Sequence, residues 1–181
     1  ENQRGYQMSD DLLARTLVHL TRLVSFDTQN PPREIGTGGI FDYLQSQLAG
    51  FRFTLTDHGA GAVSLLAVRG NPEILFNVHL DTVPAAPGWS RDPLALVVTE
   101  DKAIGLGACD IKGAAAALLA AAEVTHGDAA FLFSTDEEAN DARCIAGILR
   151  TGHGFTDVIV SEPPGCRAEL AHRRIASAQV G

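Results

Sequence analysis

Short apolar runs, each long enough for one buried strand, recur along the chain and are separated by stretches with helical spacing. The runs are apolar throughout instead of alternating, which is typical of a sheet covered by helices on both faces. The sequence therefore predicts an α/β fold: a three-layer α/β/α sandwich with a mostly parallel central sheet. Strands are expected at 51–56, 62–68, 74–78, 129–133 and 157–160, a hairpin at 94–99 with 103–106, and one more strand at 175–180.

Capping and breaking residues set the limits of the expected helices. Ser9 can cap a helix that runs to Val24, and Asn30-Pro31-Pro32 breaks the chain after it. Thr37 can cap a second helix that ends before Gly50. Two further helices are expected at 113–124 and 142–149, while the polar residues 1–8 are expected to form a tail.

Charge and hydropathy exclude two classes of partner. The formal net charge is −8 and the pI about 5.1, so a nucleic-acid-binding surface is not expected. The longest apolar run, 114–122, is much shorter than the roughly 20 residues of a membrane span, so no membrane partner is expected. The three cysteines are widely spaced with no CxxC pair, which favours a reducing, cytoplasmic location over a disulfide framework.

Polar side chains follow four of the apolar stretches. His79 and Asp81 end one strand, Asp110 precedes the alanine-rich helix, residues 136–138 are Asp-Glu-Glu after another strand, and Glu162 follows the last. Ligands of open α/β sheets bind beyond the carboxyl ends of the strands. These side chains are therefore expected to meet in one crevice.

A divalent cation would reconcile an imidazole with so many carboxylates, which would otherwise repel one another. His79 and Asp81 lie on one face of a strand, so the Asp81 carboxylate can accept the second ring proton of a metal-bound His79. Asp110 lies in a glycine-rich turn that leaves room to bridge two metals. Of the adjacent Glu137 and Glu138, one can bind metal while the other takes a proton from water.

Each of these residues also has an ordinary structural explanation. A lone histidine at a strand end usually has a structural or surface role, and Asp110 and Asp136 can cap the helices that follow them. Glu137 and Glu138 can form a solvated first helical turn, and Glu162 can lie in a plain loop. A structural explanation of this kind is common for a single residue. It is much less frequent for polar residues at four successive strand ends, and this favours a functional site.

Five motifs in this order resemble the dinuclear-zinc family of aminoacylases, acetylornithine deacetylases, succinyl-diaminopimelate desuccinylases and carboxypeptidase G. They span about half the chain. Within the family, SFDTQNPPR, GLG and DEEAND are most similar to the acetylcitrulline branch of the acetylornithine deacetylases. The motifs are HLDTVP at 79–84, GWSRDP at 88–93, GLGACDIKG at 105–113, STDEE at 134–138 and SEP at 161–163.

The resemblance implies a role for each matching residue. His79 and Glu162 would bind a first metal, Glu138 a second, and Asp110 both, beside a cis peptide bond. The catalytic residues would be Asp81, which orients His79, and Glu137, the general base and later proton donor. The cofactors would be two divalent ions, zinc first and cobalt as an alternative.

The implied reaction is hydrolysis of the acetyl amide of N-acetylcitrulline or N-acetylornithine, a step of arginine biosynthesis. A desuccinylase, dipeptidase or carboxypeptidase with the same metals is the alternative within the family, and a non-catalytic metal-binding module is the alternative outside it. Lys112 and His172 are weaker candidates for substrate binding.

The sequence departs from the family in three places. No histidine follows His172 to complete the second metal site, and the chain ends close to where the family inserts its lid domain, through which its members dimerise. Residues 9–181 are therefore expected to be the N-terminal portion of a catalytic domain without the lid, and this portion is not expected to be active alone. The usual SEPT is SEPP here, beside Glu162.

Overall fold

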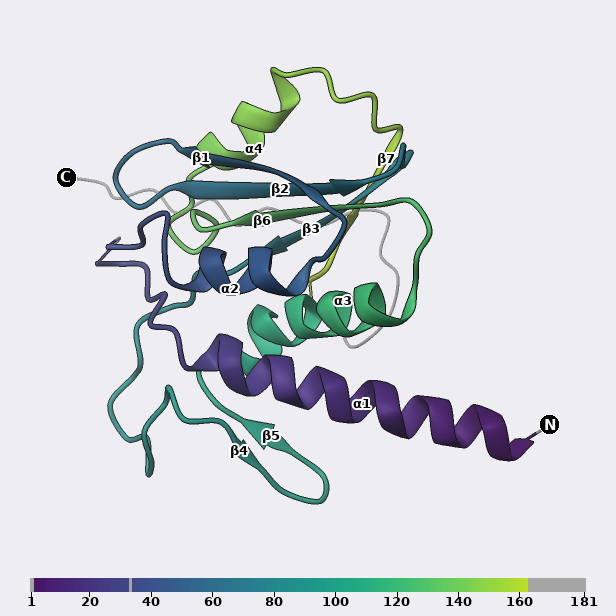
Figure 1. The fold of residues 1–181 in the computed structure, drawn as a ribbon. Helices are drawn as coiled ribbons and strands as arrows, with labels where there is room; N and C mark the ends of the chain where they lie inside the picture. Colours follow the sequence, from purple (N-terminus) through teal and green to yellow (C-terminus); the bar gives the residue numbers. More distant parts are fainter. Residues whose placement is uncertain (1, 33, 163–181) are drawn as a thin grey trace.

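One five-stranded sheet organises the protein in the computed structural model, which describes residues 2–32 and 34–162 (Figure 1). Its spatial order is β1-β2-β6-β3-β7, so β3 and β6 lie side by side in the middle of the sheet. The strands are β1 (Arg52–Asp57), β2 (Val63–Arg69), β3 (Ile74–His79), β6 (Ala129–Ser134) and β7 (Asp157–Val160).

The sheet is mixed. β3 runs parallel to both β6 and β7, whereas β2 runs antiparallel to both β1 and β6. α3 lies in the crossover from β3 to β6, and α4 lies in the connection from β6 to β7. β1 and β2 are joined by a short turn, which makes them antiparallel. The α/β class is confirmed, and the parallel character is confined to the half of the sheet that contains β3.

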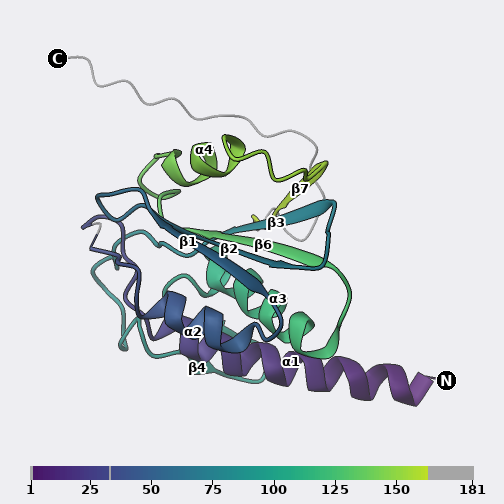
Figure 2. The same ribbon diagram turned by 45° about the horizontal axis from the view of Figure 1, so that its top comes forward.

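Helices cover both faces of the sheet (Figures 1 and 2). α1 (Asn2–Val24), α2 (Ile40–Gln47) and α3 (Gly113–Val124) lie on one face, and α4 (Arg143–Leu149) lies on the other. The larger core, between α1–α3 and the sheet, includes the fully buried Phe41, Leu119 and Phe133. A smaller cluster around Leu66, Leu75 and Leu132 faces α4.

Most expected elements are present, with three differences. α2 begins at Ile40 with Gly39 as its N-cap, so the expected cap at Thr37 is wrong. α1 begins at Asn2, ahead of the expected cap at Ser9, so residues 2–8 continue the helix where a tail was expected. The hairpin strands β4 (Val97–Val98) and β5 (Ala103–Ile104) are shorter than expected and form a separate two-stranded sheet. The strand expected at 175–180 lies outside the described residues.

A kinked turn, η1 (Ala108–Lys112), leads into α3, and the backbone of its residues Asp110 and Ile111 is not helical. It contains Asp110, whose peptide bond to Ile111 is cis, as the resemblance implied. None of the described helices combines the length and hydrophobicity that crossing a bilayer requires.

Two leucines allow a direct test of the larger core. Leu119 is fully buried against the sheet, whereas Leu149 is 75% exposed. We expect Leu119→Ala to lower the free energy of unfolding by about 2–5 kcal/mol, because it leaves a cavity that the packed core cannot fill. Leu149→Ala is the matched control and should cost less than about 0.5 kcal/mol in the same urea titration. Equal effects of the two changes would contradict this core assignment.

Candidate metal centre

The carboxyl ends of β3, β6 and β7 meet at one edge of the sheet. His79, the last residue of β3, pairs in register with Ser134, the last residue of β6. Val160 of β7 pairs with Asn77 of β3, so Glu162 follows at the same edge. Parallel pairing therefore collects the polar residues that come after each strand.

His79 is the centre of this group. Its side chain is only 3% exposed, and its Nε2 lies 3.1 Å from Oδ1 of Asp110. The same nitrogen lies 3.8 Å from Oε1 of Glu162 and 4.0 Å from Oε2 of Glu137. Carboxylates from three further segments thus surround one imidazole nitrogen.

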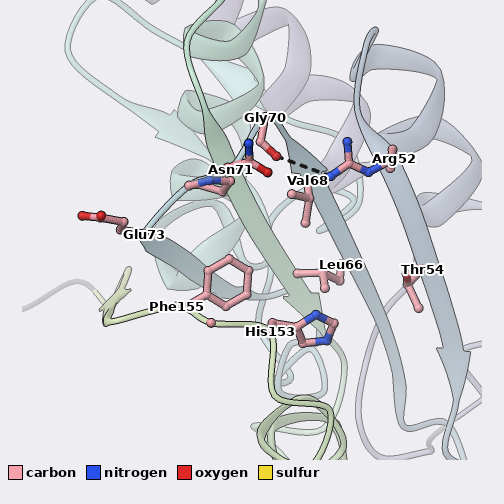
Figure 3. Close-up of a pocket in the computed structure, with 11 residues that line it drawn as sticks. Arg52, Thr54, Leu66, Val68, Gly70, Asn71, Glu73, His153 and Phe155 are labelled. Carbon is pink, nitrogen blue, oxygen red and sulfur yellow. Dashed lines mark hydrogen bonds between the residues drawn. The ribbon is translucent and has the colours of Figure 1, made fainter.

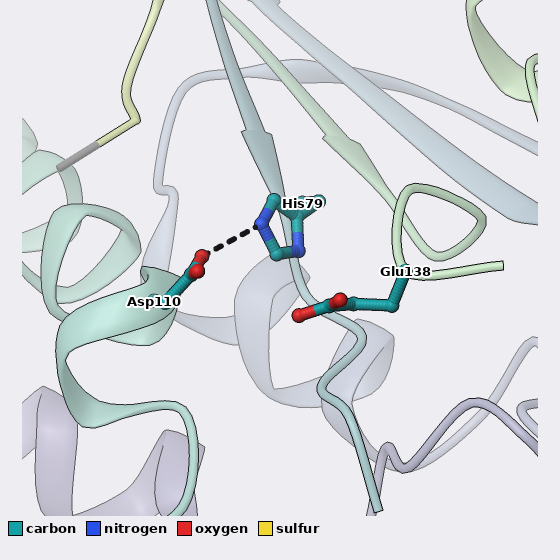
Figure 4. Close-up of side chains that lie close together, drawn as sticks. All are labelled: His79, Asp110 and Glu138. Atoms are coloured by element: carbon teal, nitrogen blue, oxygen red, sulfur yellow. Dashed lines mark hydrogen bonds and ion pairs between the residues drawn. The ribbon is translucent and has the colours of Figure 1, made fainter. Parts of the chain in front are cut away.

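Three residues are arranged as a metal site. One ligand atom each of His79, Asp110 and Glu138 lies within 4.8 Å of the others, and Asp110 and Glu138 approach the imidazole from different sides (Figure 4). Within the described part of the chain, no lysine or arginine forms an ion pair with either carboxylate. One imidazole with several carboxylates is a donor set that fits zinc or cobalt.

Electrostatics in the cluster favour a bound cation. Burial lowers the pKa of His79, but the carboxylate of Asp81, with Glu162 and Glu137, outweighs burial and raises that pKa to about 9. Burial and the neighbouring charge of Glu137 raise the pKa of Glu138. The proton that His79 retains therefore offsets part of the excess negative charge in the metal-free protein, and a divalent ion can take its place.

The raised pKa of His79 predicts a pH dependence of metal-free stability. The folded protein holds this proton up to about pH 9, whereas the unfolded chain releases it near 6.5. The stabilisation is therefore complete below about pH 6.5 and is lost as the pH rises through about 9. Urea unfolding in excess chelator should show this loss, and His79→Gln should remove it. The exposed His126→Gln is the control, and an unchanged slope in His79→Gln would contradict the prediction.

Asp81 is fully buried beneath the cluster. The acceptor closest to Nδ1 of His79 is the backbone carbonyl of Asp81 at 3.0 Å, and the carboxylate Oδ1 is farther, at 3.4 Å. The sequence predicts the carboxylate as the acceptor, whereas in the structure the main-chain oxygen is nearer to Nδ1. The carboxylate Oδ2 accepts the backbone N–H of Glu138 at 3.0 Å.

The glycine-rich turn before Asp110 permits a close approach to β3. Gly107 has a φ of +72°, which other residues rarely adopt, and a Cβ there would overlap the side chain of Thr82. The turn can therefore press against the segment after His79, which brings Asp110 within reach of the imidazole.

The remaining candidates lie elsewhere. Lys112 is fully buried, and its Nζ donates a hydrogen bond to the backbone oxygen of Phe26 at 2.9 Å instead of facing the cluster. Burial lowers the pKa of Lys112 to about 8, against the charge of Asp27. Cys109, the neighbour of Asp110 in the sequence, is exposed. His172 lies outside the described residues.

Asp136 takes the structural role that its position also allowed. Its Oδ2 accepts the backbone N–H of Cys144 at 2.9 Å, at the start of α4. Glu137 and Glu138 lie in the turn between Asp136 and this helix, not in a helical first turn. Asp136 therefore has a structural role, whereas Glu137 and Glu138, which follow it in the same loop, face the cluster.

Sequence reasoning missed Asn30. Its side-chain amide donates hydrogen bonds to Oδ2 of Asp81 and to the backbone oxygen of Thr135, each at 3.0 Å. Asn30 precedes two prolines, and this local pattern indicates only a chain break. No local pattern relates it to residues that lie 51 and 105 positions away.

A hollow of about 420 Å³ lies on the sheet face opposite α1–α3, lined by residues such as Arg52, Leu66 and Phe155 (Figure 3). It also borders Glu73, which precedes β3, whereas His79 ends that strand. None of the cluster residues lines this hollow, so it is separate from the candidate metal centre.

Comparisons with known proteins agree with the motifs. Residues 75–174 match the model of peptidase family M20/M25/M40. An N-acetyl-L-citrulline deacetylase from Xanthomonas campestris pv. campestris is 65% identical over 168 residues, 92% of this chain and 46% of that protein. A succinyl-diaminopimelate desuccinylase from Acidiphilium cryptum is 37% identical over 120 residues, 61% of this chain and 32% of that protein. The chain thus spans less than half the length of these two relatives.

Solved structures share the fold. Human carnosine dipeptidase 1 superposes with a TM-score of 0.67 at 21% identity, over 87% of this chain and 40% of that one. The dipeptidase Dug1p from Saccharomyces cerevisiae gives 0.68 at 18% identity, with the same coverage. The family match covers more than half of the chain, and the resemblance drawn from its motifs is confirmed: the chain belongs to peptidase family M20/M25/M40.

Proposed function

We propose that this chain is the N-terminal portion of the catalytic domain of an enzyme that hydrolyses the acetyl amide of N-acetylcitrulline. The observation that carries the proposal is the cluster in which carboxylates of Asp110, Glu137 and Glu162 surround Nε2 of the buried His79. The 65% identity to an N-acetyl-L-citrulline deacetylase supports the choice of substrate.

The donor set supports two divalent ions, zinc first and cobalt as an alternative. We assign His79 and Glu162 to one ion, Glu138 to the other and Asp110 to both. When bound, the ions would supply Lewis acidity that polarises the acyl carbonyl and acidifies water. Asp81 holds the chain segments of two ligands together, since its backbone oxygen lies against His79 and its carboxylate accepts from Glu138.

Glu137 is the proposed proton carrier. Its side chain is 56% exposed, and Oε2 lies 4.0 Å from Nε2 of His79, so it is open to water and substrate while bordering the cluster. It would take a proton from the attacking water and return it to the nitrogen of the leaving amino acid. Lys112 has no part in this scheme, because its ammonium group is buried against Phe26.

The rest of the enzyme is part of the proposal. The chain covers 46% of the deacetylase relative, and we propose that the missing part supplies a histidine for the second metal and a lid domain that forms a homodimer. The isolated chain is then expected to be inactive. We propose a cytoplasmic location, which the unpaired cysteines Cys109 and Cys144 support.

Side-by-side hydrolysis assays of the complete protein test the substrate. We expect N-acetylcitrulline to be cleaved with a higher kcat/KM than N-acetylornithine, N-succinyl-diaminopimelate or a dipeptide. A preference for the succinylated substrate would instead support a desuccinylase, which the 37% identity to such an enzyme makes the second candidate. Zinc uptake without turnover of any of these amides would favour a metal-binding module and refute the proposed activity.

A further inference from the structure

The segment 26–30 runs along the end of β3 like an additional short strand. Gln29 and Thr82 form a parallel β-bridge. The backbone N–H of Thr82 donates to the oxygen of Thr28 at 3.0 Å, and the N–H of Asn30 donates to the oxygen of Thr82 at 2.8 Å. The Thr28 hydroxyl donates to the oxygen of Leu80 at 2.7 Å. Main-chain bonds therefore fix the position of Asn30 beside the residues that follow His79.

The Asn30 side chain joins two strand ends. It is 2% exposed, and its amide nitrogen has two protons, which suffice for its bonds to Asp81 and Thr135. Asp81 follows β3 and Thr135 follows β6, so one planar group sets the spacing between these two segments. Buried bonds of this kind are costly to leave unmade.

The bond to Asp81 also fixes a carboxylate that contacts two expected ligands. Oδ2 of Asp81 accepts from both Asn30 and the backbone N–H of Glu138, each at 3.0 Å. The other oxygen, Oδ1, lies 3.4 Å from Nδ1 of His79. With Oδ2 occupied by two donors, the carboxyl group cannot rotate without breaking both bonds, and Oδ1 stays beside the imidazole.

We propose that Asn30 is a positioning residue of the metal centre: through the Asp81 carboxylate it fixes His79 relative to Glu138. The inference rests on the proposed function, because it takes these residues as metal ligands. Asn30 touches neither ligand directly and acts only through Asp81. Partners that orient metal ligands in this way change metal affinity by about 10–100-fold when they are removed.

Asn30→Asp tests the role, because it keeps the shape of the side chain while an ionised carboxylate has no proton to donate. Thr28→Val is the matched control: it removes one buried hydrogen bond of the same segment, to Leu80, and leaves Asp81 untouched. We expect Asn30→Asp to weaken zinc binding by the chain at least about tenfold, and Thr28→Val by less than about threefold. The visible absorption of bound Co²⁺ should change in Asn30→Asp alone.

These readouts do not depend on turnover, so they separate this inference from the proposed activity. Weakened zinc binding in Asn30→Asp alone supports the positioning role even if no acetylated amino acid is cleaved. Equal zinc affinities of the two variants, or a parent chain that binds no zinc, would overturn it.

A second measurement covers the case in which Asn30→Asp does not fold. In the unaltered chain, the side-chain amide resonances of Asn30 should shift when zinc is added, since Asp81 links this amide to both ligands. The amide of Gln47, which donates to Ser46 on the surface, should not shift. Unchanged Asn30 resonances at saturating zinc would overturn the inference.

Discussion

Replacing Glu137 by glutamine is expected to lower kcat of the complete enzyme for N-acetylcitrulline by about 10²–10⁴-fold, while zinc affinity stays near that of the parent. The amide keeps the size of the side chain but cannot take a proton from water. Glu137 lies at the edge of the cluster, 4.0 Å from the imidazole, and is more exposed than Glu138. Initial rates and a zinc titration on the same preparation measure both quantities.

Two further variants show whether the loss of activity is specific to Glu137. Glu138→Gln, the adjacent residue, should weaken zinc binding, because Glu138 belongs to the group with His79 and Asp110. Glu100→Gln, at an exposed position in the β4–β5 turn, should change neither quantity. Activity retained in Glu137→Gln would exclude it as the base, and a large loss of zinc affinity would instead make it a ligand.

Asp110→Asn is expected to weaken zinc binding by the chain by more than about 100-fold, beyond the range found for residues that only orient a ligand. Oδ1 of Asp110 lies 3.1 Å from Nε2 of His79, and the amide removes the negative charge at this position. The side chain is 55% exposed, so the free energy of unfolding of the metal-free protein should change by less than about 0.5 kcal/mol.

Asp101→Asn is the control for the Asp110 experiment. Asp101 has an exposed carboxylate in the β4–β5 turn, and its removal changes the net charge equally. Calorimetric zinc titrations of both variants at one ionic strength separate loss of a ligand from loss of overall charge. Equal affinities for zinc in the two variants would show that Asp110 is not a ligand.

Local patterns were sufficient to predict most elements of the fold. The helix expected at 113–124 is α3 (Gly113–Val124), and the strand expected at 74–78 is β3 with one residue more, His79. Apolar periodicity and glycine or proline boundaries depend only on neighbouring residues, so the sequence displays them directly. The order and direction of strands depend on contacts between distant residues, and the antiparallel half of the sheet was not predicted for that reason.

The candidate site, too, could be predicted only in part from local patterns. His79, Asp110, Glu137 and Glu162 were predicted to meet because the ends of parallel strands lie at one edge, and their side chains lie within 4.0 Å of Nε2 of His79. Their roles as ligands or base stay predictions. Asn30 was missed, because its contacts with this edge arise only after folding.

The residues of the cluster lie far apart in the sequence, and this affects how the protein binds its ion. Asp110 and His79 are 31 residues apart, and Glu138 joins them only when β6 has paired with β3. An unfolded chain therefore offers no preformed site, and high-affinity zinc binding requires that the central strands have already assembled. In a refolding experiment, zinc capture would follow the assembly of β3 and β6 and would report on it, and excess zinc would stabilise the folded state by mass action.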